Sequence, residues 1–281
     1  GTLMSVRVEL RHPLQSFLRK GMIPHIWCRG CGNGIILNCF VKALDELNID
    51  LNKVVVVSGI GCIGRISGYT NTDSFHTTHG RPIAFATGVK LVKPELKVVV
   101  ISGDGDLFAI GGNHFIHAAR RNMDIQVICA NNFTYGMTGG QHGPTTPLEA
   151  LAPTTPYGNI EHPFKLVHLA ACSGAVYVAR WTVFHAQRLI ESIKKALQKE
   201  GFSFIEAITP CTEIYGQYNK MGTAVDMMKW LKKTSEIRHH YDPVKAEITP
   251  SKIIVGEFVD IEKPGYNRLI REMIAKVQRR K

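Results

Sequence analysis

Residues 97–122 read KVVVISGDGDLFAIGGNHFIHAARRN, and this stretch decides the fold class. Its first residues hold the β-branched run VVVI, which is typical of a strand buried on both faces of a parallel sheet. Gly103, Asp104 and Gly105 follow, and the helical spacing of apolar residues then predicts a helix over 107–121. A strand, a glycine turn and a helix in this order indicate one unit of a parallel α/β sheet.

The same alternation runs through most of the chain. Further buried strands are predicted at 53–58, 125–130, 175–179 and 204–209, and further helices at 35–47, 83–92, 164–172 and 183–199. We therefore predict an α/β fold, a mostly parallel sheet with helices on both faces. After a polar loop, a charged helix at 224–233 and a strand-like run at 252–258 read as a separate tail. We expect a main domain over 1–219 and a C-terminal appendage over 220–281.

Composition and charge narrow the class of protein. A chain of 281 residues that is 44% hydrophobic and 20% charged is a globular protein, which excludes disorder and coiled coil. It shows neither an apolar run of about 18 residues that could span a membrane nor a signal peptide, so we expect a cytoplasmic protein. The net charge of +11 is compatible with binding to nucleic acid. The basic C-terminus carries no binding motif, and we expect no nucleic-acid partner.

The basic C-terminal residues also carry an apolar stripe at helical spacing. It consists of Leu269, Ile270, Met273, Ile274 and Val277. We expect an amphipathic helix that docks this stripe on the chain itself or on a neighbour.

Glycines, an acid and amides follow the predicted strands at their carboxyl ends, where open parallel sheets bind ligands. Gly103 and Gly105 would let a phosphate approach the backbone N–H groups at the start of a helix near Asp106. Asp104 and the pair Asn131–Asn132 offer the oxygen ligands that Mg²⁺ prefers beside a phosphate. The alternative is that Asp104 only caps a helix and that the two asparagines only form a turn.

Four of the seven cysteines lie on the same edge or in a metal-binding pattern. Cys28 and Cys31 form a C-x-x-C motif, and Cys62 and Cys211 follow predicted strands. Four thiolates suit either zinc or an iron-sulfur cluster, and their spacing does not separate the two. The other three, Cys39, Cys129 and Cys172, fall inside predicted helices or strands and are expected to be small core residues.

Two further segments belong to the same edge. Residues 59–64 match G-x-G-x-x-G, but a poor helix follows and no acid comes about 20 residues later, which argues against a nicotinamide site. His79 could contact a cofactor or serve as a structural histidine. Residues 135–141 (YGMTGGQ) read as a flexible loop over a phosphate or a reacting carbonyl.

Together these motifs resemble the β subunit of 2-oxoacid:ferredoxin oxidoreductases. The span from 103–105 to 131–132 is similar to the thiamine diphosphate motif, and IWCRGCGNG (26–34), SGIGCIGR (58–65), HTTHGR (76–81), YGMTGGQ and TPCTE (209–213) look like those of the family. The resemblance covers about 12–219 and is strongest to the 2-oxoglutarate branch. It implies a thiamine diphosphate-binding fold of the pyrophosphate type. It also implies coenzyme A-dependent oxidative decarboxylation, with electrons passed through a [4Fe-4S] cluster to ferredoxin.

The resemblance also implies roles for single residues. Asp104, Asn132 and the backbone carbonyl of Thr134 would bind Mg²⁺, and Cys28, Cys31, Cys62 and Cys211 would bind the cluster. The implied contacts of thiamine diphosphate are Gly61, Cys62, His79, Gly103, Asp104, Gly105, Asp106, Asn132, Thr134, Gly136, Met137 and Thr138. Arg29 replaces the usual Pro of the family, and Asn131 stands where Asp is common, which leaves every implied ligand in place.

A partner subunit follows from the same resemblance. In this family the glutamate that activates the thiamine aminopyrimidine lies on the α subunit, and no motif here supplies it, so no catalytic residue is assigned to this chain. We expect a heterodimer with an α subunit that carries the pyrimidine-binding domain and contacts the tail, with or without further small subunits. Arg65 and Arg81 are candidates for pairing with a dicarboxylate substrate, or are surface arginines.

Three alternatives stay open. The substrate could be pyruvate or a branched-chain 2-oxoacid rather than 2-oxoglutarate. The four cysteines could hold structural zinc in a non-redox thiamine diphosphate enzyme. The chain could also be a basic binding module without catalytic activity.

Overall fold

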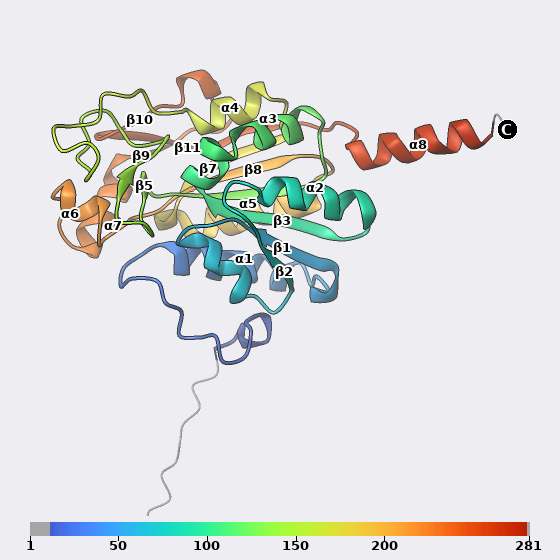
Figure 1. Cartoon of the computed structure of the whole chain (residues 1–281), viewed down its shortest axis with the longest axis horizontal. Coiled ribbons are helices and arrows are strands. Elements are labelled where there is room, and N and C mark those ends of the chain that lie inside the picture. The colour runs from blue at the N-terminus through green and yellow to red at the C-terminus, as the bar shows by residue number, and fades with distance from the viewer. Residues whose placement is uncertain (1–11, 280–281) are drawn as a thin grey trace, which may run out of the picture.

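The computed structural model describes residues 12–279 and centres on one large sheet (Figure 1). Its strands follow the order β10-β11-β7-β8-β4-β3-β1-β2, with β9 paired to β11. The pairs β1–β2, β1–β3, β3–β4, β4–β8 and β7–β8 are parallel, which confirms a mostly parallel sheet. The bounds are β1 Val54–Ser58, β2 Asp73–His76, β3 Lys97–Gly103, β4 Gln126–Asn131, β7 Tyr177–Thr182, β8 Ser203–Ile208, β9 Ser235–Ile237, β10 Ile248–Thr249 and β11 Lys252–Asp260.

Helices cover both faces of this sheet, as predicted. Val54 and Val56 of β1 pack in the core that includes α1 (Asn33–Glu46) and α5 (Ala186–Gln198). Val55 and Val57 point to the opposite core, with residues of α2 (Pro82–Val92), α3 (Gly112–Arg120) and α4 (Leu166–Cys172). Successive side chains of a strand point to opposite faces, so the run of four valines in β1 is buried on both sides.

The remaining elements lie at the edges of the sheet. They are the short hairpin β5 Thr134–Tyr135 and β6 Gln141–His142, and the helices α6 Tyr215–Tyr218, α7 Ala224–Thr234 and α8 Tyr266–Gln278. Within residues 12–279, no helix has the length and apolar character that a membrane crossing requires.

Several predicted elements differ from the structure in their bounds, and the short strands β2, β5, β6, β9 and β10 were missed. The predicted strand at 175–179 is β7, which begins two residues later. The predicted helix at 107–121 is split into a π-helical turn, Asp106–Ile110, and α3. At the junction, a Cβ on Gly111 would lie 2.9 Å from the carbonyl oxygen of Gly80, so this helix breaks where another loop packs against it. β2 was missed because its side chains are mostly exposed and carry no apolar run.

The C-terminal tail is only partly separate from the sheet. Its strand-like run is β11, which pairs antiparallel with β7, so this strand belongs to the main sheet rather than to an appendage. α8 extends away from the sheet (Figure 1), and the Asn267 amide at its start donates to the carbonyl of Lys90. Four residues of the expected apolar stripe on α8 are 48–56% exposed: Leu269, Met273, Ile274 and Val277.

Candidate active site at the carboxyl edge of the sheet

A cavity of about 250 Å³ opens at the sheet edge where β1, β3 and β4 end. The parallel direction of these strands brings the loops that follow them to one place. All of the predicted cofactor contacts line this cavity: Gly61, Cys62, His79, Gly103, Asp104, Gly105, Asp106, Asn132, Thr134, Gly136, Met137 and Thr138. The structure adds Asn33, Ile60, Ile63 and Ala130, which the sequence patterns did not single out.

Asp104 supplies a buried carboxylate to this cavity. Its Oδ2 accepts a hydrogen bond from the hydroxyl of Thr145 at 2.5 Å. Burial raises the pKa of Asp104 to about 6, although the Thr145 bond opposes this shift. Asn132 and Thr134 line the same cavity, so the carboxylate of Asp104, the Asn132 amide and the Thr134 backbone are gathered around one space. This is an oxygen ligand set of the kind that Mg²⁺ prefers.

A buried polar network supports Asp104 from behind. The Thr145 hydroxyl also lies 2.9 Å from Oδ1 of Asn131, and the Asn131 amide donates to Glu206 at 2.8 Å. Glu206 in turn accepts from Nε of Arg180 at 2.7 Å, and both side chains are at most 1% exposed. Asn131 therefore belongs to this network, whereas its neighbour Asn132 faces the cavity.

The motifs did not single out Arg180 and Glu206, although the sequence does carry a signal for them. Glu206 is an acid inside the predicted buried strand 204–209, and Arg180 directly follows the predicted strand 175–179. The structure pairs these two residues across β7 and β8. A single charge in each of two apolar runs indicates a buried ion pair.

The four predicted cluster cysteines meet in a second cavity, of about 110 Å³. Cys28, Cys31, Cys62 and Cys211 all line it. A Cβ on Gly136 would lie 3.4 Å from Sγ of Cys62 and 3.8 Å from Sγ of Cys211, so both sulfurs flank the same backbone position. Burial raises the pKa of the Cys31 and Cys62 thiols to about 11, and the other thiols contribute through like-charge repulsion.

Glycine shapes the loop that carries Cys28 and Cys31. Gly30 has a φ of +77°, and a Cβ there would lie 2.2 Å from the Cβ of Ala224, so the loop turns tightly against the start of α7. A Cβ on Gly30 would also lie 3.3 Å from Cγ2 of Thr212, so the turn brings the C-x-x-C motif beside Cys211, which is distant from it in sequence.

The two cavities share a wall. Cys62, Asn132, Gly136 and Met137 line both of them. A group held by the four thiols would therefore lie directly beside a ligand held at Asp104 and Asn132.

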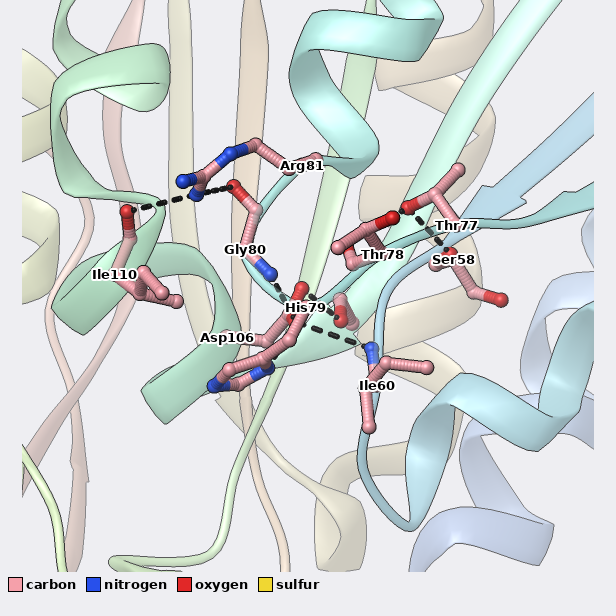
Figure 2. Close-up of polar contacts among 10 residues, drawn as sticks. Ser58, Ile60, Thr77, Thr78, His79, Gly80, Arg81, Asp106 and Ile110 are labelled. Carbon is pink, nitrogen blue, oxygen red and sulfur yellow. Dashed lines mark hydrogen bonds and ion pairs between the residues drawn. The ribbon is translucent and has the colours of Figure 1, made fainter.

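The remaining predicted residues are placed as follows. Arg65 lines the thiol cavity, and Nη1 of Arg81 donates to the carbonyls of Gly80 and Ile110 beside the cofactor cavity (Figure 2). None of the seven cysteines forms a disulfide, and Cys39 and Cys129 are buried as expected. The expectation for Cys172 was wrong, because it ends α4 and is exposed.

The sequence of the chain is similar to those of known proteins. Residues 52–207 match the model described as thiamine pyrophosphate enzyme, C-terminal TPP binding domain. The chain is 52% identical over 267 residues to 2-oxoglutarate synthase subunit KorB of Methanocaldococcus jannaschii, which covers 95% of this chain and 99% of that relative. It is 39% identical over 263 residues to a Sulfolobus 2-oxoacid:ferredoxin oxidoreductase subunit beta, covering 87% of this chain and 85% of the relative. The chain belongs to this β-subunit family.

A solved relative of this β subunit has the same fold. It is the 2-oxoglutarate:ferredoxin oxidoreductase from Magnetococcus marinus, with 2-oxoglutarate, coenzyme A and succinyl-CoA bound. The TM-score is 0.84 at 31% identity, over 99% of this chain and 94% of the other. The resemblance inferred from the motifs and the thiamine diphosphate-binding fold are thereby confirmed. The domain model spans Cys62 and Asp104, whereas Cys28, Cys31 and Cys211 lie outside the matched residues.

Proposed function

We propose that this β subunit, together with an α subunit, catalyses the coenzyme A-dependent oxidative decarboxylation of 2-oxoglutarate to succinyl-CoA. The electrons pass through a [4Fe-4S] cluster in this chain to ferredoxin. The wall shared by the cofactor cavity and the thiol cavity is the observation that carries this proposal. The names of the relatives and the ligands of the solved neighbour support the choice of substrate.

The residues of the cofactor cavity fit thiamine diphosphate and Mg²⁺. Asp104, the amide of Asn132 and the carbonyl of Thr134 would hold the cation between the protein and the diphosphate. A Cβ on Gly105 would lie 2.2 Å from the Tyr135 ring, so only a glycine lets this ring pack against the backbone that lines the cavity. When bound, thiamine diphosphate supplies the carbon nucleophile for decarboxylation.

The thiol cavity fits a cluster better than a single zinc ion. In the part of the chain that the structure describes, no three His, Cys, Asp or Glu side chains are close enough to hold one metal ion. Zinc needs its sulfur ligands about 2.3 Å away from a single centre. In a cubane each thiolate binds a different iron, so the four sulfurs stand further apart. The arrangement of Cys28, Cys31, Cys62 and Cys211 therefore favours the redox enzyme over the zinc alternative.

The acids that line the cofactor cavity indicate that an α subunit is required. Asp104 and Asp106 are the acids among its described lining residues. Asp104 is committed to the cation, and Asp106 accepts four hydrogen bonds from this chain itself. The glutamate that activates the aminopyrimidine must therefore come from the partner, which would close the open side of the cavity. The exposed apolar stripe of α8 is available for contact with the same partner. Ferredoxin would accept electrons at the thiol cavity, where Cys28 is exposed.

Two arginines are candidates for the distal carboxylate of the substrate. Arg65 is exposed beside the shared wall, and Arg81 lies at the rim near His79. A guanidinium binds a carboxylate in a bidentate fork, which would favour a dicarboxylate over pyruvate.

Copurification with the α subunit under anaerobic conditions tests the proposal. We expect a brown complex that contains iron and acid-labile sulfide and that reduces a viologen dye when coenzyme A and 2-oxoglutarate are present. Rates with pyruvate and branched-chain 2-oxoacids should be lower. A preference for pyruvate would overturn the choice of substrate. A colourless complex that contains zinc would overturn the electron-transfer function.

A further inference from the structure

The carboxylate of Asp106 ties together three segments at the edge of the cofactor cavity. Its Oδ1 accepts from the backbone N–H of Ile60 at 3.1 Å, from the backbone N–H of Gly80 at 2.7 Å and from Nδ1 of His79 at 2.7 Å (Figure 2). Its Oδ2 accepts from the hydroxyl of Ser102 at 2.8 Å. Ile60 follows β1, His79 and Gly80 precede α2, and Ser102 lies on β3. One side chain therefore holds the loops that form one side of the cavity.

These contacts leave Asp106 no free oxygen for a ligand. Its side chain is 1% exposed, and each carboxylate oxygen is already engaged. A Cβ on Gly59 would lie 1.9 Å from Oδ2, so the backbone packs directly on the carboxylate. Asp104, two residues earlier, instead has one hydrogen-bond donor from a side chain and faces the cavity.

His79 is the member of this cluster that can reach a ligand. Its side chain is 37% exposed and lines the cofactor cavity. Nδ1 faces Asp106, and Figure 2 shows the ring turned so that its other nitrogen points away from that carboxylate. The ring of Tyr135 packs edge-on against it, with the centroids 6.4 Å apart. The carboxylate and the tyrosine together restrict the orientation of the ring.

We propose that Asp106 is a positioning residue that acts through His79. Through its contact with Nδ1, it orients Nε2 of His79 toward an oxygen of the diphosphate. This inference rests on the proposed thiamine diphosphate site. It assigns the fourth residue of the GDGD sequence a task distinct from that of Asp104 two residues earlier.

A double-mutant cycle on the cluster-loaded complex with the α subunit tests the inference, with calorimetric titration of thiamine diphosphate in excess Mg²⁺ as the readout. Asp106→Asn keeps an oxygen for the three N–H donors and turns its amide to Ser102, so only the charge is lost. We expect affinity to fall about three- to tenfold. His79→Asn should weaken binding by about ten- to a hundredfold, because it loses the contact to a charged group. The double variant should bind no more weakly than His79→Asn alone. If the affinity losses of the two single variants multiply in the double variant, the inference is contradicted.

Ser102→Ala is the matched control. It removes a contact to the other oxygen of Asp106 and leaves the His79 contact intact. Affinity should change less than about twofold, because the orientation of His79 is unaffected. A loss equal to that of Asp106→Asn would show that Asp106 only stabilises the fold and would overturn the inference.

A second comparison does not depend on the Asp106 variants. His79→Asn places its amide near the position of Nδ1, whereas His79→Gln reaches the position of Nε2. The Gln variant should therefore bind thiamine diphosphate more tightly than the Asn variant, and the opposite order would contradict the inference. If the unmodified complex does not bind thiamine diphosphate, the proposed function itself fails. If the unmodified complex binds thiamine diphosphate and the affinity losses of the single variants multiply in the double variant, only the proposed role of Asp106 fails.

Discussion

The cofactor cavity and the thiol cavity lie at the same edge of one sheet and have opposite chemistry. Behind the first, Asp104 is hydrogen-bonded to Thr145, and the network continues to the buried ion pair of Arg180 and Glu206. The second is lined by thiols together with apolar side chains such as Trp27. The first cavity suits a hard cation with a diphosphate, and the second suits iron. The parallel sheet thus gathers the loops, and the side chains of each loop decide what binds.

Asp104→Ala has the largest expected effect, and it is confined to the cofactor cavity. Without the carboxylate ligand, affinity for thiamine diphosphate with Mg²⁺ should fall at least about a hundredfold. Dye reduction should be lost, and iron content should stay unchanged. Calorimetric titration and an iron assay on the same preparation check both. Loss of iron together with the cofactor would mean that the two cavities are not independent.

Cys31→Ala is the converse change. The cluster would lose one of its four ligands, so iron content and electron transfer to ferredoxin should fall severalfold. Affinity for thiamine diphosphate should stay within about twofold, because Cys31 lines only the thiol cavity. Cys172→Ala is the control, since this cysteine lies in neither cavity and should change neither property. Unchanged iron content in Cys31→Ala would contradict the assignment of the cluster.

Arg180→Ala tests the network behind the cofactor cavity. It leaves the carboxylate of Glu206 buried without its counter-charge, which should lower the free energy of unfolding by about 3–5 kcal/mol. Lys165→Ala is the matched control, because its pair with Glu247 is largely exposed and should contribute less than about 1 kcal/mol. Thermal denaturation of the complex without thiamine diphosphate measures both. Equal effects of the two variants would show that the buried pair has no special role.

The ionisation of Asp104 gives the smallest expected effect. Its pKa is raised from 3.8 to about 6 in the folded chain without a cation, so the unfolded state loses this proton first as the pH rises. Without a bound cation, the ionised carboxylate therefore lowers the free energy of unfolding at pH 7, by about 3 kcal/mol at most. Asp104→Asn should melt at a higher temperature than the unmodified complex without cofactor at pH 7. The difference should narrow toward pH 5. A constant difference across this range would contradict the direction of the pKa shift.

The sheet and both cavities could be predicted because the strongest local signals belong to them. Short β-branched runs such as residues 54–57 are typical of doubly buried strands, and the glycines, Asp104, Cys62 and Cys211 follow such strands at the edge where loops meet. All of the predicted cofactor contacts line one cavity for this reason.

The features that were missed depend on tertiary contacts. β2 is an exposed edge strand that pairs with β1 without an apolar pattern of its own. β11 looked like part of a tail because its pairing with β7 brings together residues about 80 positions apart, and no local pattern records that. The roles of Thr145 and Asp106 lie in hydrogen bonds to distant segments, which residue spacing does not show.

The central claim is that a cluster on the four thiols takes electrons across the shared wall. The direct measurement is electron paramagnetic resonance of the anaerobic complex, loaded with cluster, thiamine diphosphate and Mg²⁺, after 2-oxoglutarate and coenzyme A are added without ferredoxin. We predict the signal of a reduced [4Fe-4S] cluster, which should be absent from the Asp104→Ala complex. If a complex with intact cluster and bound thiamine diphosphate gives no such signal, the claim is contradicted.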